Sequence, residues 1–132
     1  MSVEELFSRQ KLMSLFGATL ARVAPGEVDI LLPYREDLAQ QTGALHAGTV
    51  AAIADTAAGL AALSMMEPGS GVVSVEFKVN LLAPAIGTTF LAKGRVVRAG
   101  RTISVCTADV IADGKTLVAT MLATMMRRAP RS

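Results

Sequence analysis

The sequence is poor in the residues that build disulfides, metal sites and stacked nucleic-acid interfaces. It holds one cysteine, Cys106, and one histidine, His46, so neither an internal disulfide nor a multi-histidine metal site can form. Tyr34 is the only tyrosine and tryptophan is absent, which leaves no set of aromatics to stack on bases. We therefore expect no metal and no nucleic-acid partner, and we expect Cys106 to be a buried, inert thiol.

Signals for export or membrane insertion are also missing. Glu4 and Glu5 stand where a secretory signal would carry positive charge, and no cleavage pattern follows. The apolar run 43–66 has Asp55 at its centre, and a central aspartate costs about 2.5–3.5 kcal/mol on membrane-insertion scales. Together with the lone thiol, these features predict a cytoplasmic protein without a membrane partner.

The 132 residues are enough for one domain, which we expect to span residues 1–132. Ser2 and Glu5 form a capping box that begins a predicted helix over 2–16. A long helix rich in alanine is predicted over about 46–66, and Pro68-Gly69-Ser70-Gly71 ends it. Alternation and turn signals predict six strands, at 18–24, 27–32, about 73–81, 87–98, 101–112 and 115–126.

This order of elements predicts an α+β fold with an antiparallel sheet wrapped around one long helix. The last four strands should form a meander, and the only long apolar helix available to cover the sheet is 46–66. In the strand near 73–81, alternation predicts that Val73, Val75, Phe77, Val79 and Leu81 face the core. Ser74 would then lie on the polar face.

Two polar residues of the long helix are candidates for chemistry. Asp55 is the only formally charged side chain between His46 and Met66, and a carboxylate in apolar surroundings needs partners or a shifted pKa. Nine residues of helix turn through about 900° and rise about 13 Å, so His46 and Asp55 lie on roughly opposite sides. If both serve one site, a second copy of the chain must supply one of them.

Several motifs in a fixed order resemble the PaaI-type branch of the hotdog-fold acyl-CoA thioesterases. They are Gly43-Ala44-Leu45-His46-Ala47-Gly48, Ala54-Asp55-Thr56-Ala57, Val73-Ser74-Val75-Glu76-Phe77, Pro84 and Gly100-Arg101-Thr102. The resemblance covers about residues 30–126. It implies a hotdog fold, hydrolysis of an acyl-CoA thioester, and assembly into a dimer or a dimer of dimers.

The resemblance also implies roles for individual residues. Asp55 matches the position of the family's catalytic carboxylate, which acts as nucleophile or general base. Gln40 matches the position of a residue that places the thioester or the water, and Gln41 is a near alternative. His46 and Ala47 begin the central helix, where the Ala47 N–H would hold the oxyanion, although the family has glycine at this position. The implied substrate-binding residues are Gly48, Ser74, Arg98 and Arg101. No cofactor is implied, because coenzyme A is part of the substrate.

Two other functions fit the same fold. A catalytically silent acyl-CoA-binding module is possible, but a pure binding site has no need of a carboxylate in apolar surroundings, and no output segment is attached. A hotdog dehydratase or hydratase would pair histidine with an acidic residue in a different motif. Its proline-rich loop after the histidine is missing here. Ser74, Arg98 and Arg101 could equally be ordinary surface residues.

Overall fold

The computed structural model describes residues 2–130; Met1, Arg131 and Ser132 lie outside the described part of the chain. The predicted order of elements is confirmed, except that the first helix is split in two. The elements are α1 (Val3–Ser8), α2 (Lys11–Phe16), β1 (Thr19–Ala24), β2 (Glu27–Pro33), a 3-10 turn η1 (Glu36–Leu38), α3 (Ala47–Leu63), β3 (Gly71–Leu81), β4 (Thr89–Ala99), β5 (Ile103–Ala112) and β6 (Thr116–Arg128).

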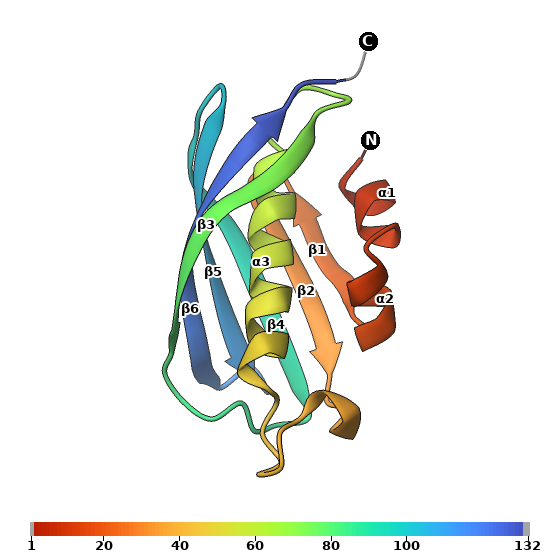
Figure 1. The fold of residues 1–132 in the computed structure, drawn as a ribbon, viewed down its shortest axis with the longest axis vertical. Helices are drawn as coiled ribbons and strands as arrows, with labels where there is room; N and C mark the ends of the chain where they lie inside the picture. The colour runs from red at the N-terminus through yellow and green to blue at the C-terminus, as the bar shows by residue number, and fades with distance from the viewer. Residues whose placement is uncertain (1, 131–132) are drawn as a thin grey trace.

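The six strands form one antiparallel sheet that curves around α3 (Figure 1), which confirms the predicted α+β hotdog architecture. The strand order is β1-β2-β4-β5-β6-β3. The predicted four-strand meander is therefore wrong for β3, which pairs with β6 at the far edge and not with β4. Segment 82–88 then passes around the N-terminal end of α3 to reach β4 at the centre of the sheet (Figure 1).

The helix α3 is buried on the side that faces the sheet. Ala54, Ala57 and Ala58 are fully buried there. Their small side chains let the helix and the sheet approach closely. The closest approach is at Gly94 of β4, where an added Cβ would lie 2.3 Å from the carbonyl oxygen of Ala57. A side chain at position 94 would therefore push α3 off the sheet.

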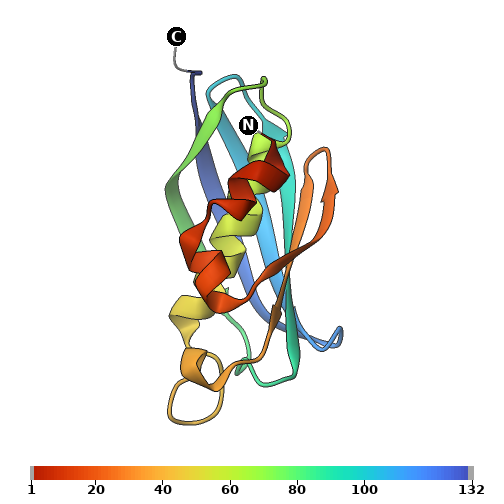
Figure 2. The same cartoon turned by 90° about the vertical axis from the view of Figure 1, so that its right-hand side faces the viewer.

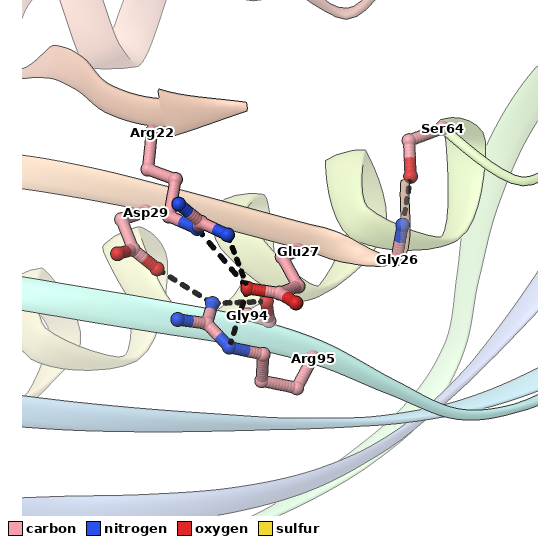
Figure 3. Close-up of polar contacts among 7 residues, drawn as sticks. All are labelled: Arg22, Gly26, Glu27, Asp29, Ser64, Gly94 and Arg95. Atoms are coloured by element: carbon pink, nitrogen blue, oxygen red, sulfur yellow. Dashed lines mark hydrogen bonds and ion pairs between the residues drawn. The ribbon is translucent and has the colours of Figure 1, made fainter. Parts of the chain in front are cut away.

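The C-terminal end of α3 is tied to the first hairpin. The Ser64 hydroxyl accepts the Gly26 N–H at 2.8 Å (Figure 3). The same hydroxyl donates to the Ala61 carbonyl at 2.6 Å. Gly26 adopts a positive φ of 74° in the β1–β2 turn, a conformation that glycine reaches without a Cβ penalty. This contact fixes the axial position of α3 relative to β1 and β2.

An ion-pair network joins β1, β2 and β4. Arg95 donates to Asp29 Oδ1 at 2.6 Å, and both Arg22 and Arg95 lie within 3.6 Å of Glu27 Oε1 (Figure 3). Asp29 is buried, and a buried carboxylate requires such a partner. The network pairs carboxylates of β2 with arginines of β1 and β4, and so helps to hold these three strands together.

The helices α1 and α2 lie beside α3 on the same side of the sheet (Figures 1 and 2). Ser2 caps α1 as predicted, since its hydroxyl accepts the Glu5 N–H at 3.1 Å. The continuous helix expected over 2–16 is wrong, because Gln10 has an extended backbone and starts a second helix. The break lets Val3 from α1 and Met13 and Phe16 from α2 all reach the core.

The edge strand β3 exposes apolar side chains that were predicted to be buried. Exposed fractions are 37% for Val73, 53% for Val75, 42% for Phe77 and 54% for Leu81, and only Val79 packs against the core. The prediction fails at Val73 and Val75 because a β-bulge between Ser74 and Glu76 shifts the register and sets Val73 opposite the exposed Met126. It fails at Phe77 and Leu81 because β3 lies at the edge of the sheet and has no neighbour on its outer side. A long apolar edge strand is a surface that pairs readily with another chain.

Candidate active site

The N-terminus of α3 presents one free N–H group. Such an end leaves four N–H groups without a helical partner. Three of them are satisfied: the His46 N–H donates to the Leu38 carbonyl, the Gly48 N–H to His46 Nδ1 at 2.8 Å, and the Thr49 N–H to the His46 carbonyl. Within residues 2–130, the Ala47 N–H donates to no group. The positive end of the helix dipole therefore offers a single donor at Ala47, suited to an oxygen anion.

This donor opens on a cavity of about 330 Å³, here called the Ala47 cavity. Its walls come from Gln40 and Leu45 before the helix, from Val50, and from the end of β3 and the segment after it, with Leu81, Leu82, Ala83, Pro84, Ala85 and Val118. Gln41 does not line the Ala47 cavity but a different hollow beside η1. Of the two glutamines considered, the structure brings only Gln40 to Ala47.

The carboxylate of Asp55 lies half-buried on the middle of α3, on the flank that the sheet leaves uncovered. The Ser74 hydroxyl lies 2.6 Å from Asp55 Oδ1 and 3.4 Å from the Met125 sulfur, and it can donate to the carboxylate. A hydroxyl donor orients the carboxylate and leaves its second oxygen for other partners. Asp55 is thus a positioned carboxylate that remains accessible.

The polar face predicted for Ser74 is wrong. A β-bulge shifts the register between Ser74 and Glu76, so that Ser74 lies opposite the buried Met125 while Glu76 lies opposite Thr124. The extra residue, Val75, breaks the simple alternation along the strand. Ser74 consequently points toward α3, whereas a regular strand would have turned it away from Asp55.

A second cavity, of about 270 Å³, surrounds the carboxylate and is called here the Asp55 cavity. Its lining comes from three parts of the chain: α1 and the joint that follows it, α3, and the paired ends of β3 and β6. The residues are Leu6, Gln10, Asp55, Thr56, Gly59, Leu60, Gly71, Val72, Ser74 and Arg128. No residue lines both this cavity and the Ala47 cavity, as the helix geometry of His46 and Asp55 predicted.

Comparison with known proteins identifies the family. The model of the thioesterase superfamily matches residues 42–119, which contain both Ala47 and Asp55. The chain belongs to the thioesterase superfamily. This confirms the prediction of a thioester hydrolase.

Relatives of this thioesterase share most of its length. A crystal structure of a thioesterase family protein from Silicibacter pomeroyi is 44% identical, covers 96% of this chain and 95% of its own, and superposes with a TM-score of 0.92. A protein of Halobacterium salinarum, provisionally named an esterase, is 32% identical over 80% of this chain and 72% of its own. The PaaI protein of Escherichia coli, from the phenylacetic acid degradation operon, shares the fold at 17% identity, with a TM-score of 0.88 and coverage of 96% and 90%.

The other predicted site residues of the thioesterase lie outside both cavities. Arg98 is at the end of β4 and Arg101 is in the turn before β5; both are exposed, and neither forms an ion pair within the described residues. Gly48 serves the helix cap, because an added Cβ would lie 3.0 Å from His46 Nδ1. His46 likewise acts on its own helix, so its proposed catalytic part is to aim the Ala47 N–H.

Sequence reasoning misses most of the wall around Asp55. The sequence pattern gives Leu6, Gln10 and Arg128 no part in the site. Gly59 carries a usable signal, since it follows Asp55 by four residues and so shares its helix face. The contribution of α1 could not be foreseen, because nothing in the local pattern places α1 beside the middle of α3.

No other chemistry is indicated in the described chain. Within residues 2–130, no three His, Cys, Asp or Glu side chains gather in a way that could hold a metal ion. In the same range, no helix combines the length and the apolar character that a membrane crossing requires. Burial raises the pKa of the Cys106 thiol to about 11, so this cysteine stays protonated near neutral pH, as expected of an inert core residue.

Proposed function

We propose that this thioesterase hydrolyses acyl-CoA at a site that two copies of the chain share. Asp55 of one copy and Ala47 with Gln40 of the other would face the same thioester. The observation that carries the proposal is the position of the two cavities along β3. The Asp55 cavity is lined by Gly71, Val72 and Ser74 at the start of the strand, and the Ala47 cavity by Leu81 at its end.

Antiparallel pairing of β3 with β3 of a second copy would join these cavities. The strand spans 11 residues and ends about 34 Å from where it starts, so pairing about its middle sets the start of one β3 beside the end of the other. The exposed Val73, Phe77 and Leu81 support this edge as the contact. A register centred on Phe77 would also set Glu76 opposite Lys78 of the second copy, a favourable opposite-charge pair. Two sites then arise by symmetry, and a dimer of dimers stays a further prediction.

The chemistry follows from the two groups. Asp55 takes a proton from a water molecule while the water oxygen attacks the thioester carbonyl carbon, and the Ala47 N–H stabilises the negative charge on the carbonyl oxygen. When the intermediate collapses, the C–S bond breaks and the coenzyme A thiolate leaves and is protonated. Alternatively, the Asp55 carboxylate attacks the carbonyl itself, and water hydrolyses the resulting anhydride. In either route Gln40 places the water or the thioester.

The exposed arginines of the β4–β5 turn are proposed to bind the phosphates of coenzyme A. Arg98 and Arg101 lie near one another in the chain, and residues 78–132 carry nine Lys/Arg against two Asp/Glu. Replacing both with alanine should raise KM several-fold and leave kcat nearly unchanged, because binding lost equally from substrate and transition state appears in KM. Steady-state kinetics over a range of ionic strength measure this. An unchanged KM would remove both arginines from the site.

Thiol release from a panel of acyl-CoA esters tests the proposed function. We expect the wild-type protein to liberate one thiol per thioester and to sediment as a dimer or larger assembly while active. A silent binding module would release no thiol, yet acyl-CoA would still raise its melting temperature. An active monomer would contradict the shared site. The cytoplasmic location and the absence of a cofactor remain predictions, and activity after dialysis against a chelator addresses the latter.

A further inference from the structure

The wall of the Asp55 cavity includes residues that the superfamily match does not reach. The match covers residues 42–119, whereas Leu6 and Gln10 come from α1 and the joint with α2. Val3, Met13 and Phe16 hold these helices to the core, and Leu6 itself is half-buried. Figures 1 and 2 show α1 and α2 beside α3, on the same side of the sheet. The N-terminal helices therefore add a wall to the site that the matched segment does not supply.

We propose that the Asp55 cavity receives the acyl group of the substrate, and that Leu6 and Gly59 set the largest acyl group accepted. The inference rests on the proposed function. If the carbonyl carbon of a thioester lies at Asp55, the acyl group and the long, charged coenzyme A group extend from it in different directions. A cavity of about 270 Å³ is too small for the coenzyme A arm, since pockets for whole drug-sized ligands begin near 300 Å³.

The chemistry of the wall selects compact, uncharged acyl groups. The cavity has apolar surface from Leu6, Leu60 and Val72. Burying this surface against a hydrocarbon chain lowers the free energy of binding, whereas burying it against a charged chain end does not. Gln10 and Arg128 also line the cavity, and Arg128 is exposed. A preference for acyl groups that end in a carboxylate would therefore identify Arg128 as the selecting residue and contradict the apolar assignment.

Gly59 allows the cavity to be made smaller without disturbing the fold. It lies one helical turn after Asp55, and a Cβ added there would meet only the Met125 side chain, at 3.9 and 4.0 Å, which is ordinary contact. Alanine is also the better helix former. Gly59→Ala should thus fill part of the cavity while the melting temperature stays equal or rises. Leu6→Ala changes the cavity in the opposite direction, and Leu12→Ala is its matched control, because Leu12 is exposed on α2 and does not line the cavity.

The test compares kcat/KM for acetyl-, butyryl-, hexanoyl-, decanoyl- and phenylacetyl-CoA across these variants. Relative to acetyl-CoA, Gly59→Ala should lower kcat/KM about 10-fold or more for the largest ester that the wild type accepts, because a methyl group in a close-fitting pocket discriminates by that factor. Leu6→Ala should raise it by a similar factor for the next larger ester. Leu12→Ala should keep the wild-type profile.

Two outcomes separate this inference from the proposed function. Hydrolysis with profiles that agree within twofold in the wild type, Gly59→Ala and Leu6→Ala would overturn the acyl cavity and leave the thioesterase proposal standing. If the wild type released no thiol, the proposed function would fail. The acyl cavity would then be tested by the rise in melting temperature that acetyl-CoA and decanoyl-CoA cause in each variant. If each ligand caused the same rise in Gly59→Ala as in Leu6→Ala, the assignment of the cavity to the acyl group would be overturned.

Discussion

Replacing Asp55 with asparagine is expected to lower kcat at least 10²-fold while the protein stays folded. Asparagine keeps the shape of the side chain, and its amide oxygen can still accept the Ser74 hydroxyl that now lies 2.6 Å from Asp55 Oδ1. The substitution removes the negative charge and with it both the base and the nucleophile. Thiol-release kinetics and a melting curve measure the two expectations separately.

Asp109→Asn is a matched control for this variant. Asp109 is also half-buried, and its carboxylate accepts the Thr120 hydroxyl at the same 2.6 Å, but it lines neither cavity. We expect its turnover to match the wild type. Turnover within a few-fold of wild type in a folded Asp55→Asn dimer would show that Asp55 is a structural carboxylate and would end its assignment as the catalytic group.

Replacing Ala47 with proline removes the oxyanion donor at a position where helices accept proline. Proline lacks the N–H, and the first helical residue is where that loss is tolerated. The preceding His46 already has the extended backbone that proline demands, with φ −61° and ψ 140°. We expect turnover to slow by about 10²- to 10³-fold, the usual effect of losing one such donor. Ala47→Gly keeps the N–H and loses only the methyl group, so thiol-release assays should find it at least 10-fold more active than Ala47→Pro.

Mixing the two inactive variants tests whether the site is shared. In a heterodimer of Asp55→Asn and Ala47→Pro chains, one site would contain both defects and the other would contain none. After unfolding and refolding together in equal amounts, about a quarter of the wild-type activity should return, given random pairing in a twofold dimer. If each chain held a complete site, mixing would restore nothing.

The sequence predicts where the helices and strands of this fold lie better than it predicts which strands pair in the sheet. Alanine content and the proline and glycine after it define α3 to within three residues at its end, and period-two alternation locates all six strands. Alternation describes one strand at a time and contains no information on pairing. The place of β3 beside β6 depends on how segment 82–88 rounds the helix, which is a property of the whole chain.

The candidate site is predictable where it depends on spacing along one helix. The nine-residue spacing correctly implied that the start of α3 and Asp55 lie apart: Ala47, next to His46, lines one cavity and Asp55 lines the other. The contact between Ser74 and Asp55 was hidden by the bulge at Val75, because one extra residue exchanges the two faces of a strand. The helix break at Gln10, which brings Leu6 toward Asp55, likewise depends on packing. No glycine or proline marks this break in the sequence.

The order of strands in the sheet also determines when β3 finds its partner during synthesis. The ribosome makes β3 before β4, β5 and β6, but its neighbour in the sheet is β6, the last of them. Until β6 emerges, the nascent chain carries an apolar strand with both edges unpaired, the kind of segment that associates wrongly with other chains. Glu76 and Lys78, the only charges within β3, oppose such association during this interval.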